Sequence, residues 1–285
     1  MKNLIEIYCY VDNFMKKIQE KKVEIGRPSI LNKSSYITLS IIKNMYGMRT
    51  IRQLYEFTKQ YLQKDFPQLP SYQQFNEGIT SCYRYVIVLL YCMTRSIRSK
   101  QHAVHFVDST SLPVCKIFRE KFAKLFKGIA KKSKSTMGWF YGFKLHLIIN
   151  QNMEIEAITF TDANINDLQV LEKDFIDQIR GFLVGDKGYL SKEKTEELRK
   201  KNIFLLTKYR KNSKQKYPAT PQQLKILRQR LKIEAVFHLL KNNFNLISSY
   251  ARSIQGYFAN VLSALLAYSI SKTKKLFEFD FLPTF

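Results

Sequence analysis

Three acidic residues have the type and setting needed for phosphodiester chemistry in this strongly basic chain. Asp108 and Asp186 each follow a short apolar run, and Glu234 is the single acid between residues 208 and 241. Carboxylates that are brought together repel one another unless cations lie between them. Such hard oxygen ligands select Mg²⁺ or Mn²⁺, and two ions about 3.5–4 Å apart can serve the attacking and leaving oxygens of a phosphodiester. The alternative is that each acid only pairs with a neighbouring lysine.

The elements expected around these acids could bring them together. The runs 102–108 and 181–185 predict short strands, each ending at an acid. Because functional groups gather beyond the carboxyl ends of strands in an α/β sheet, the two aspartates are expected to converge. A long helix predicted from 222 to about 245 would bring Glu234 close to them.

The first hundred residues show helical rather than strand periodicity. Ser34 and Ser35 can cap one helix, Gly47 breaks it, and Thr50 can cap a second helix from 51 to 62. This spacing suits a DNA-binding helix-turn-helix, and an ordinary helical hairpin is the alternative.

Beyond residue 100 the pattern predicts a mixed sheet flanked by helices. A hairpin is expected from strands 143–150 and 154–161, and a further strand at 203–206. Helices are expected at 166–179, 191–200 and 254–270. We therefore predict a helical, DNA-binding region over 1–100, a catalytic domain over 101–250, and a C-terminal helix and tail over 251–285.

The net charge of +24, from 47 Lys and Arg against 23 Asp and Glu, indicates a polyanionic partner. Most of this excess lies in two segments, 116–144 and 208–241, which would suit a channel for double-stranded DNA better than two ordinary surfaces. Candidate phosphate contacts in the first segment are Lys131, Lys132, Lys134 and Lys144. The sequence has neither a secretory signal nor an apolar run of about 20 residues, so we expect a cytoplasmic protein without a membrane partner.

Several sequence blocks resemble one known family. They are VDST at 107–110, GFKLHLIIN at 142–150, TDANINDL at 161–168, GDKGYL at 185–190, RLKIEAVFHLLK at 230–241 and FANVLSALLAYSI at 258–270. Together they resemble the DDE transposases of bacterial insertion sequences, and most of all the insertion sequence nine-eight-two family. The resemblance implies a ribonuclease H-like fold, with the three acids as ligands of divalent ions, Mg²⁺ or Mn²⁺, two per site. It also implies a dimer assembled on DNA, in the bacterial cytoplasm and at the nucleoid.

The same resemblance assigns DNA-contacting roles around Glu234. Arg230 and Lys241 match two positions of the signature Y-x2-R-x3-E-x6-K, and on one helix they would share the face of Glu234. The tyrosine position holds Leu227, so its hydroxyl role cannot be transferred. Solvent-facing helix charges are the alternative for both basic residues.

Five other positions have less specific signals. Lys187 could contact a phosphate and Tyr189 could stack on a base, although Lys-Gly-Tyr after a strand is also an ordinary turn. Trp139 suits either distorted DNA or core packing. His105 and His146 are expected to be structural.

The predicted function is transposition by metal-dependent cleavage at element ends, followed by strand transfer from the freed 3′ hydroxyl. One alternative is a stand-alone metal-dependent nuclease on the same fold. The other is an inactivated transposase that acts as a DNA-binding repressor, in which the three acids would be expected to erode first.

Overall fold

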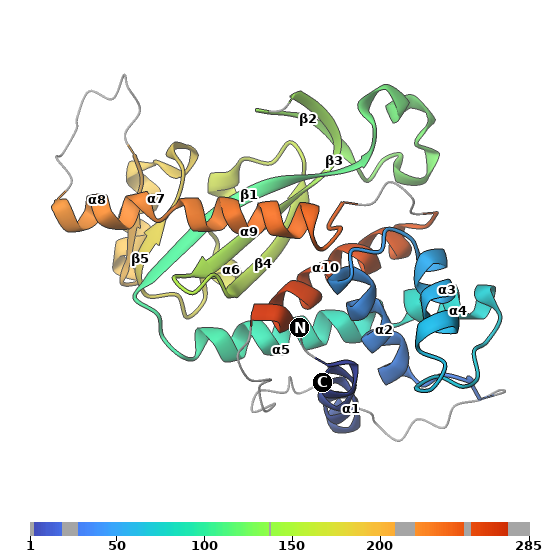
Figure 1. Cartoon of the computed structure of the whole chain (residues 1–285). Coiled ribbons are helices and arrows are strands. Elements are labelled where there is room, and N and C mark those ends of the chain that lie inside the picture. The colour runs from blue at the N-terminus through green and yellow to red at the C-terminus, as the bar shows by residue number, and fades with distance from the viewer. Residues whose placement is uncertain (1–2, 19–27, 137, 209–219, 248–251, 273–285) are drawn as a thin grey trace. The chain divides into compact units, whose positions relative to one another are not determined.

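The computed structural model describes residues 3–18, 28–136, 138–208, 220–247 and 252–272 (Figure 1). These residues form two compact units, one built from residues 1–93 and 239–285 and the other from 94–238. No helix in the described ranges is long and apolar enough to cross a membrane.

The first unit is helical, as the sequence predicts. Its helices are α1 (Leu4–Ile18), α2 (Lys33–Met45), α3 (Ile51–Tyr61), α4 (Tyr72–Ser81), most of α5 (Tyr83–Arg98) and α10 (Ile254–Lys272). Thr50 caps α3 as expected and forms a reciprocal capping box with Gln53, which satisfies backbone N–H groups at the start of the helix. Asn32, rather than Ser34 or Ser35, caps α2.

Helix α2 lies at the centre of this unit and packs against α1, α3, α4 and α10. Its residues 34–44 are all buried, including Lys43. The Lys43 Nζ donates to Asn260 Oδ1 on α10 at 2.7 Å, and burial lowers the pKa of this lysine to about 8. The C-terminal helix is therefore held against the N-terminal helices by polar as well as apolar contacts.

The second unit contains a mixed six-stranded sheet. Its strands are β1 (Val104–Cys115), β2 (Lys131–Ser135), β3 (Gly138–Asn150), β4 (Ile155–Asp162), β5 (Gly181–Val184) and β6 (Ile203–Leu206). The order is β2-β3-β1-β5-β6, with β4 also paired to β3. The β1–β3, β2–β3 and β3–β4 pairs are antiparallel, whereas β1–β5 and β5–β6 are parallel.

Successive side chains on a strand point to opposite faces of a sheet, which separates two environments here. One face carries Val107, Ile148 and Leu183, and buries them in a core with residues of 168–179, 189 and 198. The elements on this face are the short turns η3 (Asp167–Val170) and η4 (Lys187–Tyr189) and the helices α6 (Lys173–Ile176) and α7 (Lys192–Lys200).

Helix α9 (Leu231–Asn242) begins over the opposite face of the sheet (Figure 1). There the Lys232 Nζ lies 6.0 Å from the centre of the Phe106 ring and donates to the Gln151 carbonyl at 2.8 Å. These contacts fix the start of α9, and therefore Glu234, relative to β1.

Three sequence predictions for this unit are corrected. The predicted helix 222–245 is two helices, α8 (Pro221–Arg228) and α9, separated by Gln229 and Arg230. The predicted helix 166–179 is divided into η3 and α6, although its apolar stripe does face the core. Asp108 does not end its strand, because β1 continues to Cys115 in antiparallel pairing with β3.

The two compact units cross the boundaries of the expected functional division into 1–100, 101–250 and 251–285, which stays a prediction. The boundaries fall inside α5 and α9, and α10 belongs with the N-terminal helices because it packs on α2 and α4. The predicted irregular basic stretch after residue 207 lies outside the described residues from 209 to 219.

Candidate active site

Asp108 and Asp186 occupy equivalent positions on neighbouring parallel strands. The last paired residues of β1 and β5 are Phe106 and Val184, and each aspartate follows two residues later. Asp108 thus lies where the parallel β5 ladder ends, even though the antiparallel ladder with β3 continues. The sheet therefore places the two aspartates at the same level beyond the paired part of β1 and β5, and the convergence of their carboxylates stays a prediction.

Arg230 links Asp108 to Glu234. Its guanidinium Nη1 lies 3.6 Å from Asp108 Oδ2, and its Nη2 donates to Glu234 Oε1. Arg230 stands in the turn before α9 rather than on the same helix as Glu234, yet the offset of four residues still brings their side chains together. The side chain of Glu234 remains 45% exposed, whereas that of Asp108 is 21% exposed.

The negative charge of Asp108 is incompletely compensated. Burial raises the pKa of this carboxyl to about 6, and the charges of Asp186 and Asp167 act in the same direction. The Ser109 N–H, which donates to Asp108 Oδ1 at 2.8 Å, and the Arg230 guanidinium oppose that rise. Several carboxylates therefore act on one another here, and a cation would relieve their repulsion.

Asp167 is a fourth acid that acts on Asp108, and its sequence surroundings do not mark it as an isolated carboxylate. Its Oδ2 accepts from Ser109 Oγ at 3.0 Å and its Oδ1 accepts from Lys144 Nζ at 2.9 Å. Lys144 also donates to the Ile165 carbonyl at 2.8 Å. The ammonium of Lys144 is therefore engaged within the protein, and its phosphate contact stays a prediction. Asp167 lies in the block TDANINDL at 161–168, and this block was the sequence feature that could have indicated it as a site residue.

Tyr189 is buried next to the acids instead of facing DNA. The residue is 1% exposed, its ring packs over Gly185, and a Cβ at that glycine would come within 2.9 Å of the ring. The predicted stacking of a DNA base on Tyr189 would require an exposed ring, whereas this residue is buried. Its hydroxyl has no hydrogen-bond partner among the described residues, and burial together with Asp167, Asp108 and Asp186 raises its pKa.

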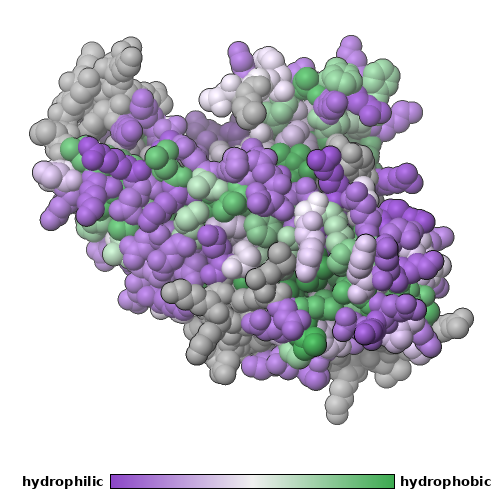
Figure 2. Space-filling view, viewed as in Figure 1, coloured by the Kyte–Doolittle hydropathy of each residue, from purple (hydrophilic) through white to green (hydrophobic). Residues whose placement is uncertain are grey.

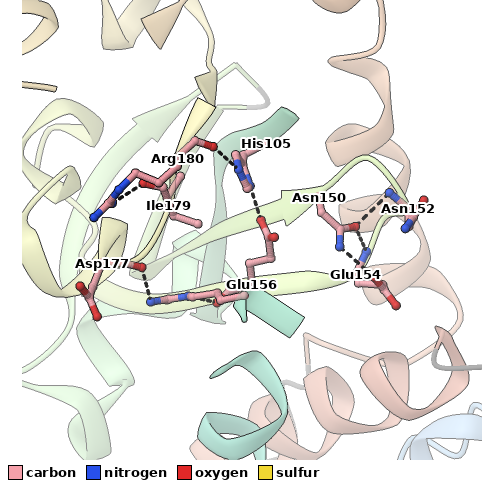
Figure 3. Close-up of polar contacts among 9 residues, drawn as sticks. His105, Asn150, Asn152, Glu154, Glu156, Asp177, Ile179 and Arg180 are labelled. Carbon is pink, nitrogen blue, oxygen red and sulfur yellow. Dashed lines mark hydrogen bonds and ion pairs between the residues drawn. The ribbon is translucent and has the colours of Figure 1, made fainter. Parts of the chain in front are cut away.

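His105, on the opposite face of β1, belongs to a buried polar cluster in which Glu156 Oε1 has no hydrogen-bond partner among the described residues (Figure 3). Its Nδ1 lies 2.6 Å from Glu156 Oε2, and its Nε2 donates to the Arg180 carbonyl at 2.8 Å. The pairing of β3 and β4 passes from Ile148–Ala157 to Ile149–Ile155, so Glu156 is the extra residue of a bulge. A bulge re-aims a side chain, and here Glu156 points at His105.

The remaining predicted site residues fall into three groups. Lys131, Lys132, Lys134 and Lys187 are exposed and stay predicted DNA contacts. Lys241, on α9 two turns beyond Glu234, is partly buried, which lowers the pKa of its ammonium. Leu227 is 7% exposed and His146 is fully buried, with its Nε2 2.8 Å from Thr161 Oγ1.

The three acids are of the chemical type that binds a hard divalent cation, but their carboxylates are not grouped closely enough to share one. Asp108, Asp186 and Glu234 offer only carboxylate oxygens, the ligands that Mg²⁺ and Mn²⁺ prefer. In the described parts of the chain, however, no three His, Cys, Asp or Glu side chains are grouped closely enough to hold a metal ion. Arg230, which contacts both Asp108 and Glu234, would have to move for their carboxylates to share a cation.

Comparisons with known proteins agree with this fold. A family model described as a transposase DDE domain matches residues 98–254. The cryo-EM structure of the piggyBac transposase synaptic complex with hairpin DNA is similar, with a TM-score of 0.52 and 9% identity, over 94% of this chain and 73% of that chain. The Mos1 transposase paired-end complex with left transposon end also matches, at 12% identity over 90% of this chain and 83% of that one, but its TM-score of 0.23 carries no argument. No curated protein matches this sequence.

The mixed sheet and its flanking helices define a ribonuclease H-like fold, the fold of the transposases that it resembles. The chain belongs to the transposase DDE domain family, because the family model covers more than half of its residues. The predicted class, a DDE transposase, is thereby confirmed.

Proposed function

We propose that this transposase moves an insertion sequence by cutting the phosphodiesters at the ends of the element and joining the freed 3′ hydroxyls to target DNA. The observation that carries the proposal is that Arg230 contacts both Asp108 and Glu234 beside the end of the β1–β5 ladder, where Asp186 also follows its strand. The blocks shared with the insertion sequence nine-eight-two family support an element of that bacterial type.

Asp108, Asp186 and Glu234 would hold two Mg²⁺ or Mn²⁺ ions. When bound, such ions supply activation of the attacking oxygen and charge stabilisation of the leaving oxygen. Asp108 lies on β1 and Asp186 follows the neighbouring strand β5 by two residues, which supports their sharing these ions. Glu234 completes the set from α9, which Lys232 holds against β1.

Arg230 is suited to exchange partners during the reaction. Its guanidinium has five donors in a planar fork that matches phosphate as well as carboxylate oxygens. Without DNA it contacts Asp108 and Glu234, and it would turn to the phosphate of the scissile strand when cations neutralise these acids. Such a contact aligns the DNA without reading its sequence.

The charge distribution supports double-stranded DNA as the partner. Exposed Lys131, Lys132 and Lys134 on β2, with Lys187 beside Asp186, would contact phosphates leading to the carboxylates. The helices of the first unit would bind the element ends. Because two ends must be brought together, the protein would act as a dimer on DNA, in the cytoplasm and at the nucleoid.

The proposal is tested with DNA that carries both sequences flanking the gene and with purified protein in Mg²⁺. We expect nicks at the element ends and joined products, both abolished by chelation or by Asp186→Asn. Glu193→Gln is a matched control, because this exposed acid begins α7 in the same unit and should leave cutting unchanged. Cutting that is insensitive to Asp186→Asn would overturn the proposal.

The two alternatives give different products in the same assay. A stand-alone nuclease would cut without joining strands to target DNA. A repressor would bind the ends and leave the DNA intact in any divalent cation.

A further inference from the structure

Large apolar side chains are exposed together in the connection between β1 and β3. This connection, residues 116–136 with Trp139, is called the aromatic lobe below. Phe118 is 73% exposed, Phe122 is 78% exposed and Trp139 is 57% exposed. Apolar side chains gathered in this way on a surface mark an interaction site.

The aromatic lobe is attached to β3 by the buried Phe126 and by Tyr141, and not by the exposed rings. Phe126 is 4% exposed and meets the Phe143 ring edge-on, with ring centres 6.5 Å apart. The Tyr141 hydroxyl donates to the Phe126 carbonyl at 2.9 Å. Phe126 and Tyr141 attach the lobe to β3, whereas Phe118 and Phe122 remain exposed, with the Lys116 Nζ 6.0 Å from the centre of the Phe118 ring.

The charge around the exposed rings indicates what that partner is. Glu120 is the lobe's single acid, and its carboxylate pairs with Lys132 at 3.0 Å. The Lys132 Nζ also lies 5.6 Å from the centre of the Trp139 ring. Figure 2 shows hydrophilic and hydrophobic residues interleaved in the upper-right region, where Figure 1 places the lobe. The basic residues are Lys116, Arg119, Lys121, Lys124, Lys127, Lys131, Lys132 and Lys134.

Flat rings among ammonium groups suit the unpaired bases of DNA. Bases stack on aromatic side chains while lysines follow the backbone phosphates, and this binding tolerates any sequence. A second copy of the chain is disfavoured as the occupant, since two lobes of the same strong positive charge repel each other.

The position of the lobe fixes which bases it could reach. Strand β1 runs seven residues from Asp108 to Cys115, next to the first residue of the lobe, and a strand rises about 3.3 Å per residue. The lobe therefore begins about 23 Å from Asp108, which corresponds to about seven nucleotides at 3.4 Å each. We propose that the aromatic lobe binds unpaired bases about seven nucleotides from the phosphodiester at the carboxylates. This inference relies on the proposed function for the location of that phosphodiester.

Trp139 provides a direct readout, because it is the only tryptophan in the chain. Its fluorescence is recorded without divalent cations while a duplex with a central unpaired stretch is added, and then a fully paired duplex of equal length. We expect quenching and binding about tenfold tighter with the unpaired stretch. Equal quenching and affinity for the two duplexes would overturn the inference.

Substitutions separate stacking from charge. Phe118→Ala with Phe122→Ala should lower the affinity for the unpaired DNA about tenfold and leave binding of the paired duplex unchanged. Phe204→Ala is the matched control, because Phe204 is 47% exposed on β6, outside the lobe, and should cause no loss. Melting temperatures check that the variants fold. An unchanged affinity in the double variant would contradict stacking.

A fluorescent adenine analogue then locates the contact. It is placed at successive positions from the 3′ end of a pre-cut DNA end, and its quenching should be greatest near the seventh nucleotide. Asp186→Asn should retain this signal even if cleavage is lost, so failure of the lobe and failure of the proposed catalysis are distinguishable. Quenching that does not depend on position would overturn the assignment.

Two other occupants would each replace the proposed one. Quenching of Trp139 by vesicles of phosphatidylserine and phosphatidylcholine, without preference for unpaired DNA, would assign the lobe to an anionic membrane. A dimer in sedimentation equilibrium that dissociates in the double phenylalanine variant would assign it to an interface between copies.

Discussion

Strand β1 carries an ionisable side chain on each face, His105 on one and Asp108 on the other, and the surroundings of the two differ. His105 has both ring nitrogens engaged, by Glu156 and by the Arg180 carbonyl, and neither His105 nor Glu156 is accessible (Figure 3). Asp108 lies three residues later and is near other acids. The Arg230 Nη1 lies 3.6 Å from its Oδ2. A structural ion pair is thus completed by the protein itself, whereas the candidate active site leaves negative charge for a partner to complete.

The largest effect that we expect is the loss of DNA cleavage when an acid of the candidate active site is substituted. Asp186→Asn should reduce single-turnover cleavage of end DNA by about 10³-fold or more, since a charge that stabilises the transition state is lost. Asp186 is exposed and makes no capping bond, so the melting temperature should stay within about 1 °C. Both are measured on the same preparation, and a loss of cleavage that follows a loss of folding would break the comparison.

Substitution in the buried His105–Glu156 pair should instead lower the stability of the protein. Glu156→Ala should lower the free energy of unfolding by about 3–5 kcal/mol, because His105 would be left buried without its carboxylate. Urea unfolding measures this change. Glu197→Ala on α7 is the contrast: its carboxylate pairs with Lys194 and Lys201 at the surface, and its loss should cost less than about 1 kcal/mol. Similar values for the two variants would contradict a structural role of the buried pair.

Arg230 should act on catalysis more than on binding. Arg230→Ala should slow cleavage about 10–100-fold through lost alignment and change DNA affinity by less than about threefold. It should also tighten Mn²⁺ binding, because the guanidinium no longer contacts Asp108 and Glu234. Calorimetric titration with Mn²⁺ measures this, and Arg230→Lys keeps the charge as a control. Weaker Mn²⁺ binding in the alanine variant would show that Arg230 supports the site rather than competing for it.

The smallest expected effect is on the pH dependence of stability. Burial lowers the pKa of His105, but Glu156 and the Arg180 carbonyl outweigh this, so its pKa is raised above the usual value. A raised folded-state pKa means that the stabilisation is fully present below about pH 6.5 and decreases as the pH rises through the folded-state pKa. Stability should therefore decline toward alkaline pH in the wild type, and less so in Glu156→Ala. Parallel pH profiles would contradict the linkage.

Local patterns were sufficient for much of the fold. The cap at Thr50, the hairpin of β3 and β4 and the strand β5 depend on neighbouring residues, and the sequence predicts them. Contacts between distant segments were not predictable in this way. The lysine-rich β2 lacks a strand pattern and exists through its pairing with β3, and the bulge at Glu156 follows from the register of that sheet.

The candidate site shows the same division between local and distant information. Asp108, Asp186 and Glu234 stand out because they are isolated acids in a basic chain. Asp167 does not, since its importance arises from Ser109 and Lys144, which lie far from it in the sequence. Tyr189 resembled an exposed turn residue, and only the packing of η4 over Gly185 shows that it is buried.

The most direct test of the central claim is the affinity of the protein for Mn²⁺ without DNA, measured by electron paramagnetic resonance. If Asp108, Asp186 and Glu234 share divalent cations, then Asp108→Asn, Asp186→Asn and Glu234→Gln should each weaken binding at least about tenfold, which corresponds to about 1.4 kcal/mol. Glu193→Gln should bind as the wild type does. Binding that persists unchanged in all three variants, or that is lost equally in Glu193→Gln, would contradict a shared site at these three acids.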